Sequence, residues 1–533
     1  MTSENLVDRI VKYFDPVRAR DRARSRMMMA LAGGYVGASR TRRSMISWNP
    51  MGNDPDSDTI LDLPTLRARS RDLLRNTPLA TGAINTNCSS VVGTGLKLQC
   101  RIDRDMVNMT EEQADAWEAG TEREWRLFSE SPECDVARTL PFSGLQELAF
   151  RSALESGDVF AVLPYILRNG SPYGTKVQLV EADRVCNQGN KADTDTLVGG
   201  VEKDGNGAPV TYHILKQHPG RVLGPRAFEW VLVPAFGAKT GRRNVIHLYR
   251  VLRPGQTRGV PYLAPVIEPL KQLDRYTEAE LMASVVAAMF TVFVKSEEGD
   301  GEISPFAPTA ETGGSTSDDD YKLGNGAIVG LAPGEDISTA NPGRPNNSFD
   351  PFVMSILRQV GVALELPFEV LIKHFTASYS AARAALLEAW RFFGARRYWL
   401  AQSFCRPVYE TWLDEAVAIG RIKAPGYFTD PILRQAYLGA QWIGDAAGQI
   451  DPVKEITAAE KRIALGISTV AEETAGITGG DFEKNIPQIR KERRLLKEAG
   501  LMAIPAATSA GNGTDAAPAP PDETGMPERR VPN

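Results

Sequence analysis

The chain has 533 residues, of which 42% are hydrophobic and 24% are charged, with a formal net charge of −5. Such a length is too great for one hydrophobic core and predicts about three or four modules. The composition is that of a folded soluble protein, which excludes a fibrous or largely disordered chain. The slight acidic excess also lacks the strongly basic character by which a nucleic-acid-binding domain is usually recognised.

Neither disulfide bonds nor membrane insertion is expected. The five cysteines are widely spaced, without a CxxC pair, which indicates free or buried thiols in a reducing compartment. The longest apolar run, residues 281–294, is shorter than the roughly 20 residues that a membrane-spanning helix needs. The apolar patch at 27–32 is short and lies between arginines, unlike a secretory signal.

Residues 1–60 are predicted to form a basic N-terminal arm. Between Met1 and Arg43 there are ten Lys or Arg residues against four Asp or Glu residues. An arm of this kind either contacts phosphate groups or an acidic neighbour, or is a solvated tail. The sequence leaves both interpretations open.

Residues 61–260 are expected to fold as an α+β module whose strands are mostly antiparallel. Helical patterns cover 63–82, 117–128 and 145–156, and a strand-like run covers 88–100. Short β-rich runs follow, separated by loop dipeptides such as Gly199-Gly200. Those runs are 159–167, 176–180, 210–215, 228–233 and 244–249.

Two helices of similar length are predicted on either side of a low-complexity segment. The first lies within 262–294 and is followed by a strand; either its regular part begins near Pro269 or its axis bends there. Residues 295–347 are expected to be a mobile acidic loop with one strand-like run, 326–335. The second helix covers 349–366. This arrangement predicts a stalk with a small tip.

A polar loop follows, and it carries Lys373 and His374. On the local sequence alone it is an ordinary connection between helices. Thr376, Ser378 and Ser380 then precede a run rich in Ala, Leu and Glu, which predicts a helix N-terminus because hydroxyl groups accept the free amide hydrogens of a first turn.

The remaining chain is predicted to be helical up to a disordered tail. A long helix from Ser380 to about Gly420 is interrupted only at Gly394 and Pro407, and its aromatic side chains are expected in the core. Further helices are predicted at 451–466 and, with a basic character, at 482–500; residues 501–533 are rich in Ala, Pro, Gly and Thr.

No arrangement of residues typical of an active site occurs. The four histidines and the cysteines offer no metal-ligand spacing, and HExxH and GxSxG are absent. Residues 237–240 lack the pattern of a P-loop, and 324–330 are not followed by the helix that a dinucleotide site needs. We therefore expect no catalytic residues, no metal and no cofactor, and a scaffold or conduit instead of an enzyme.

Several motifs resemble those of the portal proteins of lambda-type tailed phages. They occur in order between about residues 30 and 500. The motifs are RSRDL (69–73), RN (75–76), VGTG (92–95), the run 200–214, RPGQTRGVPYLAP (253–265), LAPGE (331–335), ASYSAARAALLE (377–388), WIG (442–444) and IDPVKE (450–455).

The resemblance implies a portal fold assembled as a ring, dodecameric in the capsid, around a DNA channel at one five-fold vertex. The parts of such a portal follow the order of the predicted elements. They are, after the arm, a wing (61–260), a stem helix (261–290), a clip (291–345), a second stem helix (346–366), a tunnel loop (367–379), a long wing helix (380–429), a helical crown (430–500) and the tail (501–533).

The resemblance also implies partners and a location. A terminase motor packages the genome through such a ring, the genome is later ejected through it, and head–tail connector proteins attach to it. The implied partners are copies of this chain, double-stranded DNA, the terminase large subunit, a head–tail adaptor protein, the major capsid protein and the scaffold, with no membrane. The implied location is the virion, with host cytoplasm during assembly.

A DNA channel should hold DNA weakly, because each neutralised phosphate adds affinity that would slow sliding. The side chains expected to make brief contacts are therefore few. They are Lys373, His374, Ser378, Tyr379, Lys271 and Arg275.

Two other interpretations compete with a portal. An enzyme built on the α+β module would need a site that the sequence does not contain. A monomeric nucleic-acid-binding protein would use the basic arm and the basic helix that includes Arg490 and Lys497. The size of the particle distinguishes both from a ring.

Overall fold

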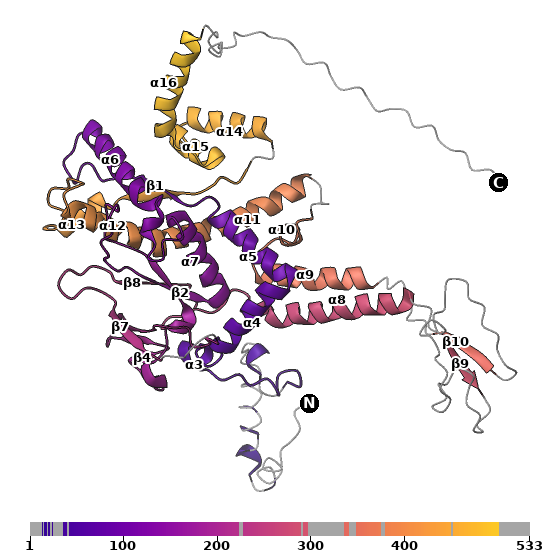
Figure 1. Ribbon diagram of the computed structural model, residues 1–533. Helices are drawn as coiled ribbons and strands as arrows, with labels where there is room; N and C mark the ends of the chain where they lie inside the picture. The colour runs from indigo at the N-terminus through magenta and orange to yellow at the C-terminus, as the bar shows by residue number, and fades with distance from the viewer. Residues whose placement is uncertain are drawn as a thin grey trace, which may run out of the picture.

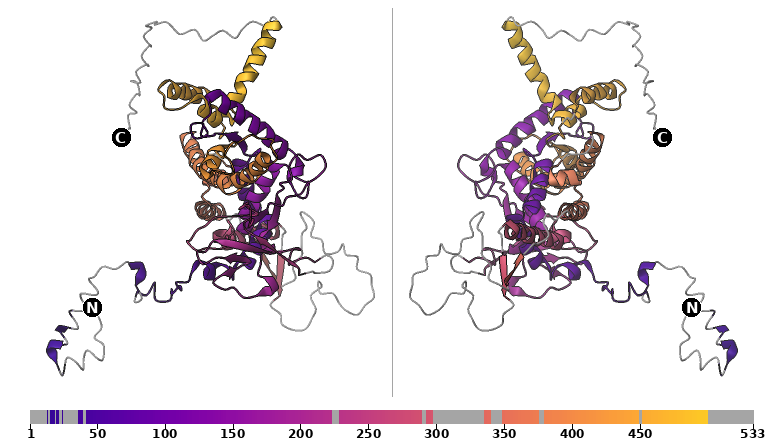
Figure 2. Two further views of the ribbon diagram at one scale, coloured as in Figure 1. Left: turned by 90° about the vertical axis from the view of Figure 1, so that its left-hand side faces the viewer. Right: turned by 90° about the vertical axis from the view of Figure 1, so that its right-hand side faces the viewer.

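The computed structural model describes residues 42–222, 228–288, 292–296, 335–339, 348–374, 379–448 and 451–499, with a few short pieces before residue 40. A mixed body of helices and sheets carries a projecting pair of helices on one side, and a group of C-terminal helices stands at its end (Figures 1 and 2). The expected mixture of helices and antiparallel strands is confirmed.

The body begins with helices that pack on one another. They are α3 (Pro55–Thr59), α4 (Leu63–Asn76), α5 (Pro78–Val91), α6 (Glu111–Ser129) and α7 (Phe142–Ser156). The predicted helix over 63–82 is in fact two helices, because Pro78 lacks the amide hydrogen that would continue α4 and instead occupies the first turn of α5.

The expected strand over 88–100 is wrong in its first part. Cys88 and Val91 belong to α5, and with Ile84 and Val92 they form a buried stripe at helical spacing. Only Lys97–Cys100 form a strand, β1. The helix and the strand are joined through Gly93 and Gly95, both of which have a positive φ.

The strands of the body form small sheets in which the ladders are antiparallel. One sheet has the order β3-β2-β8, and the other has the order β4-β5-β6-β7. The bounds are β2 Asp158–Val162, β3 Gln178–Glu181, β4 Leu197–Val198, β5 Val201–Lys203, β6 Pro209–Leu215, β7 Trp230–Pro234 and β8 Val245–Tyr249. The predicted strand runs are thus confirmed, although the first ends at Val162.

The projecting pair consists of α8 (Ile267–Ala288) and α9 (Phe349–Ala363). A short 3₁₀ turn precedes α8, so Pro269 lies in its first turn, as one of the two sequence interpretations expected. Strands β9 (Val292–Ser296) and β10 (Glu335–Thr339) pair antiparallel at the far end (Figure 1). The strand-like run at 326–334 and the acidic loop lie outside the described residues.

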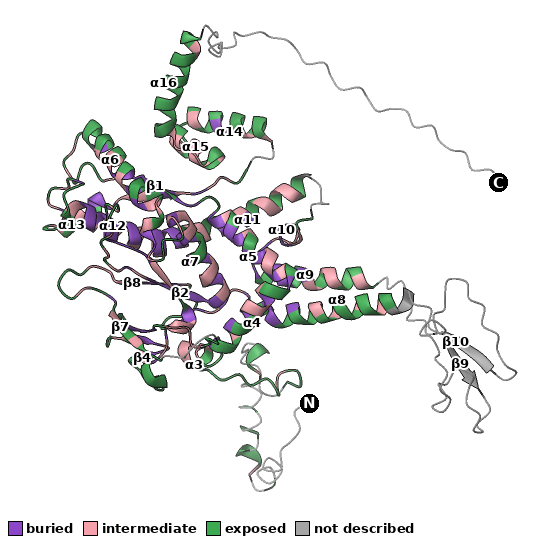
Figure 3. Cartoon of the chain, in the orientation of Figure 1, coloured by how far each residue is buried: buried purple, intermediate pink, exposed green. Residues whose placement is uncertain are grey.

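A long helical segment crosses the core of the body. It comprises α11 (Tyr379–Leu400), a π-helical turn (Ala401–Cys405) and α12 (Arg406–Ala418). The wide turn falls just before Pro407, whereas Gly394 does not interrupt the helix. The predicted burial of its aromatic side chains is confirmed for Phe404 and Trp412, while Tyr398 is exposed. Figure 3 shows that α12 is largely buried, whereas the N-terminal part of α11 is not.

Residues that follow α12 complete the body. Helix α13 (Pro431–Tyr437) precedes β11 (Ala440–Ile443), which pairs antiparallel with β1 and places Leu98 opposite Trp442. Both of those side chains lie in the main hydrophobic core. A pairing between segments so far apart in the chain has no local signal in the sequence.

The C-terminal helices are α14 (Pro452–Ala464), α15 (Val470–Thr478) and α16 (Phe482–Glu498). Helix α15 was not predicted, although Thr469 and Glu472 form a complete capping box at its start. Within these helices only Ala459 is buried. The ion pair between Lys484 and Glu122, with 2.7 Å between Nζ and Oε2, connects α16 to the body.

The cysteine prediction is confirmed: all five are free, and only Cys186 is not fully buried. No helix in the described part of the chain is long and apolar enough to cross a bilayer. Among the same residues, no group of His, Cys, Asp and Glu side chains is placed to hold a metal ion.

Candidate functional site at the projecting helices and their junction with the body

The base of the projecting pair is held by apolar side chains that face between its helices and the body. On α8 the buried residues are Ile267, Leu270 and Leu273, which recur at the three- and four-residue spacing of one helix face. Leu357 and Val360 are the corresponding buried positions on α9. Burial of this kind makes the base a rigid extension of the body.

The outer part of the pair is packed less tightly. The Tyr276 ring stacks against Phe349 at 5.5 Å between centroids and meets the edge of Phe352 at 5.2 Å. Beyond this contact, Leu281 and Met282 are 64% and 57% exposed. The outer half of α8 therefore presents apolar side chains that the described residues do not cover.

The segment between β8 and α8 is fixed by its own side chains. Oε1 of Gln256 accepts hydrogen bonds from the backbone amides of Leu252, at 2.8 Å, and Arg253, at 3.3 Å, while its Nε2 donates to the carbonyl of Arg258 at 2.7 Å. Thr257 is held by Asp56 of α3, whose Oδ1 accepts from the Thr257 amide at 2.7 Å. The chain thus enters α8 along one defined path.

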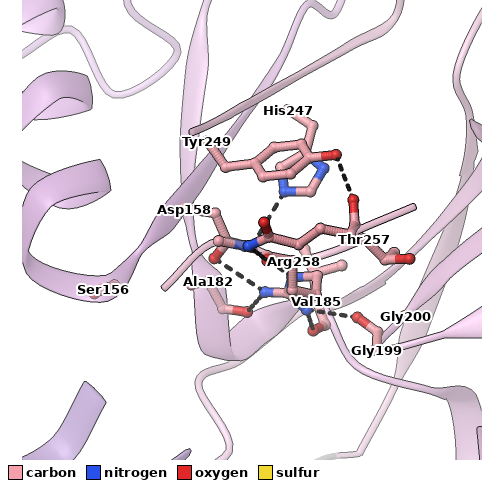
Figure 4. Close-up of polar contacts among 12 residues, drawn as sticks. Ser156, Asp158, Ala182, Val185, Gly199, Gly200, His247, Tyr249, Thr257 and Arg258 are labelled. Carbon is pink, nitrogen blue, oxygen red and sulfur yellow. Dashed lines mark hydrogen bonds and ion pairs between the residues drawn. The ribbon is translucent and has the colours of Figure 1, made fainter. Parts of the chain in front are cut away.

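Arg258 and Asp158 form the centre of this junction, and Figure 4 shows their contact. Nε of Arg258 lies 2.5 Å from Oδ2 of Asp158, and Nη2 of Arg67 lies 2.9 Å from Oδ1. His247 Nε2 and the Gly259 amide also contact Oδ2, at 3.1 and 3.3 Å. The carboxylate is completely buried, and two guanidinium groups compensate its charge.

The other nitrogens of Arg258 reach two separate segments, the turn Ala182–Val185 after β3 and Gly199 between β4 and β5. Nη2 donates to the carbonyl of Ala182 at 2.8 Å, and Nη1 donates to those of Val185 at 2.8 Å and Gly199 at 2.5 Å (Figure 4). One side chain on the segment that leads into α8 therefore joins both sheets of the body. A planar guanidinium with five N–H groups is suited to this task.

The pKa values at the junction follow from burial and charge. Burial by itself raises the pKa of Asp158, but Arg258, Arg67 and the hydrogen bond from His247 hold it well below its usual range. Burial lowers the pKa of His247, and Asp158 opposes that shift. Burial also lowers the pKa of Arg67, to about 10. Asp158, Arg258, Arg67 and His247 thus compensate one another's burial and connect β2 and β8 to α4 and to the segment before α8.

Two glycines let the junction segment approach β2. A Cβ atom added to Gly259 would lie 2.0 Å from the carbonyl oxygen of Gly157, and one added to Gly157 would lie 2.4 Å from that of Gly259. Gly157 also ends α7 with φ of 90°, a conformation that favours glycine. Close approach of the two backbones is what brings the Gly259 amide to Asp158.

Of the predicted channel residues, Lys373 and His374 lie next to each other, after a short helix, α10 (Phe368–Ile372). Lys373 ends that helix in the left-handed conformation, with φ of 55°, and the His374 amide donates to the carbonyl of Glu369 at 3.1 Å. Both side chains are exposed. Ser378 and the side chain of Tyr379 lie outside the described residues.

Lys271 and Arg275 lie about one turn apart on α8, and both are exposed. Nζ of Lys271 is 3.2 Å from Oδ2 of Asp274. Lys271 and Arg275 thus lie on α8, whereas Lys373 and His374 follow α10, so the described channel candidates belong to two different elements.

Sequence reasoning missed the buried junction. The motif at 253–265 pointed to its segment, but nothing local indicated that Arg258 pairs with Asp158, Arg67 and His247. The available signal was a charged residue directly after the Gly157 helix end, at the start of an apolar strand. An acidic residue in such a position needs a buried cation.

Residues 41–397 match the family model for phage portal proteins of the lambda family. This is more than half of the chain. The chain belongs to the lambda family of phage portal proteins. The resemblance found in the motifs is thereby confirmed, and with it the role of a phage portal. Residues after Arg397 lie beyond the family match.

The portal relatives cover a wider range of the chain. Portal protein B of Escherichia phage lambda is 26% identical in an alignment over 499 residues that covers 88% of this chain and 91% of the relative. The portal protein of Escherichia phage N15 is 26% identical in an alignment over 489 residues that covers 88% of this chain and 90% of the relative. The neck of an empty GTA particle aligns with 82% of this chain and 98% of its own at 14% identity, with a TM-score of 0.44, too low to establish the fold.

Proposed function

We propose that this portal protein assembles into a ring, dodecameric in the capsid, around a channel for double-stranded DNA at one vertex. The genome is packaged through the ring and later ejected through it. The observation that carries the proposal is the projecting pair of helices with a two-stranded tip, in a chain of the portal family. A ring of such pairs forms a tube.

The parts of the portal are assigned by their place in the structure. In this proposal the body is the wing, the projecting pair is the stem, β9 and β10 belong to the clip, and the C-terminal helices belong to the crown. Supporting this, α8 and α9 leave the body together and the tip lies between them in the chain. Because α13 and β11 pack into the body, the independent part of the crown begins after Ile443.

The partners follow from the same assignment. The clip binds the terminase large subunit during packaging and a head–tail adaptor protein afterwards, while the wing contacts the major capsid protein and the scaffold. The portal family is a structural one, and the chain carries no P-loop. We propose that the terminase supplies the chemical energy and that this chain acts as a passive conduit in the virion, having assembled in host cytoplasm.

DNA in the channel is contacted by a few exposed side chains. Lys271 and Arg275 on the stem, and Lys373 and His374 in the tunnel loop with Ser378 and Tyr379, are proposed for this role. The exposed position of the four described side chains supports it. Few cations per subunit keep the affinity for phosphate low, which allows DNA to slide.

Particle size tests the proposal. Purified chain, examined by native mass measurement and negative-stain imaging under several salt and concentration conditions, should give closed rings of many subunits. A strictly monomeric species under all of these conditions would contradict it and would favour the nucleic-acid-binding interpretation. Addition of a short DNA duplex to the monomer would then test that alternative directly.

A further inference from the structure

A cavity of about 400 Å³ lies between the body, the end of α9 and α11. Helix α7, the segment around Tyr262 and one face of α11 form its walls, and its charged groups come from Arg250, Glu365 and Arg396. The buried junction at Asp158 does not use these three residues. The cavity adjoins the junction at Gly157 and Leu252, but its charged groups are not those of the junction.

Arg396 is the unusual residue in this cavity. Its guanidinium carbon lies 4.4 Å from the ring centroid of Tyr262 and 4.4 Å from that of Phe392. Its Nε is buried, and within the described part of the chain no acceptor is bonded to it. Burial and, to a smaller extent, the nearby Arg250 lower the pKa of Arg396. A guanidinium in this state lacks the acceptor that normally compensates its desolvation.

Glu365 does not supply that acceptor. It lines the same cavity, but no ion pair joins its carboxylate to Arg396 or Arg250 among the described residues. The Glu365 backbone follows α9 with φ of 55°. Its own amide donates to the carbonyl of Val362, and the next amide, that of Leu366, donates to the carbonyl of Gly361. The cavity consequently holds two guanidinium groups against one carboxylate and is complementary to a further negative charge.

The surroundings indicate a protein occupant. A shallower hollow of about 740 Å³ shares Glu365, Phe392 and Ala395 with the cavity and extends to Val362, which is 82% exposed. Leu252, on the cavity side, is 62% exposed. An apolar rim around a cationic pocket fits an acidic side chain on a folded surface, whereas a cavity of this size admits side chains and not a DNA duplex.

We propose that an acidic side chain of a second copy of this chain enters the cavity and pairs with Arg396 and Arg250. The inference rests on the proposed ring. In a ring the two contacting surfaces of each subunit differ, so a cationic pocket on one flank requires an acidic surface on the other. The chain has 66 Asp and Glu residues against 61 Lys and Arg residues, so a second copy can supply an acidic side chain.

The first test compares Arg396→Met with Arg391→Met in the full chain. Arg391 lies on the same helix, its side chain is 84% exposed, and its ion pair among the described residues is with Glu388 of that helix. Loss of a buried charge pair at each interface should raise the chain concentration needed for half-assembly by about thirtyfold or more in R396M. R391M should assemble like the wild type.

The thermal stability of the unassembled chain distinguishes this role from a purely structural one. R396M should melt within a few degrees of the wild type, because the desolvation cost of the uncompensated guanidinium offsets its two cation–π contacts in the isolated chain. A lower melting temperature together with unchanged assembly would overturn the proposal. Absence of rings in the wild type would instead refute the proposed function itself.

A photo-crosslinking residue at Ala395 provides a second measurement that does not depend on stability. Irradiated rings should yield covalent dimers of the chain, with the cross-linked peptide containing Asp or Glu. Cross-links confined to one chain, or made to DNA in rings loaded with a duplex, would overturn the proposal.

Discussion

Asp158 and Arg258 are separated by a hundred positions in the chain, yet Oδ2 of the first lies 2.5 Å from Nε of the second, and both side chains are buried. This pair connects β2 to the segment that leads into α8. The orientation of the projecting pair relative to the body therefore depends on a buried charge pair as well as on apolar packing.

Removal of Arg258 tests this connection. Arg258→Met leaves Asp158 with a buried charge that Arg67 alone compensates, and the free energy of unfolding should fall by about 3–5 kcal/mol, measured by urea denaturation. The control is Arg253→Met, whose ion pair with Asp58 is about half exposed on both sides and should change the stability by about 1 kcal/mol or less. Similar losses in the two variants would contradict a special role for Arg258.

The stability should also depend on His247 as the pH falls. Burial lowers the pKa of His247 in the folded chain, so below the unfolded value of about 6.5 the unfolded chain binds more protons. The contribution to stability is present above that pH and is lost as the pH falls through the lower, folded pKa. His247→Gln should flatten the stability curve between about pH 6.5 and 5. The exposed variant His374→Gln is the control, and equal slopes in H247Q and the wild type would refute the prediction.

Much of the element order could be predicted from the sequence, because the spacing of apolar residues in helices such as α7 and strands such as β6 has the period of that element. The prediction of a strand at Cys88–Val91 was wrong because four apolar or small residues fit the spacing of a strand as well as that of a helix. The packing of α5 against the core determines that they are helical. The pairing of Leu98 with Trp442 and the contact of Asp158 with Arg258 could not be predicted, since both depend on where distant segments meet.

Substitution of alanine for glycine should have opposite effects on stability at Gly259, which lies against the backbone of Gly157, and at Gly394, which has open space around it. Gly259→Ala places a methyl group against the backbone of Gly157 and should destabilise the chain by about 2–3 kcal/mol or more, because backbone cannot move as a side chain can. Gly394→Ala, in open space within α11, should stabilise it by about 0.5–1 kcal/mol. Thermal unfolding of both variants gives the comparison, and a neutral G259A would show that the segment adapts.

The tunnel-loop proposal can be tested without disturbing the backbone. Lys373 has φ of 55°, a conformation that asparagine tolerates, so Lys373→Asn removes the charge while keeping the helix end. Combined with His374→Ala, it should leave ring formation intact and alter the rate of DNA packaging or the retention of packaged DNA. Glu369→Gln, on the same short helix, serves as the control. Unchanged packaging and retention in the K373N/H374A variant would remove this loop from the mechanism.

The exposed apolar side chains on the outer half of α8, in the proposed stem, predict a contact between copies. Leu281 and Met282 face solvent in the single chain, and burying each in an interface would contribute about 1.5–3 kcal/mol. The double substitution Leu281→Ser and Met282→Ser should therefore reduce the yield of rings strongly, as counted by negative-stain imaging. The melting temperature of the unassembled chain should stay nearly unchanged, because neither side chain is buried there. Glu278→Ser, an exposed change on the same helix, should assemble normally. Rings formed by the double variant as readily as by the wild type would show that the outer stem faces the channel or solvent and not a neighbouring subunit.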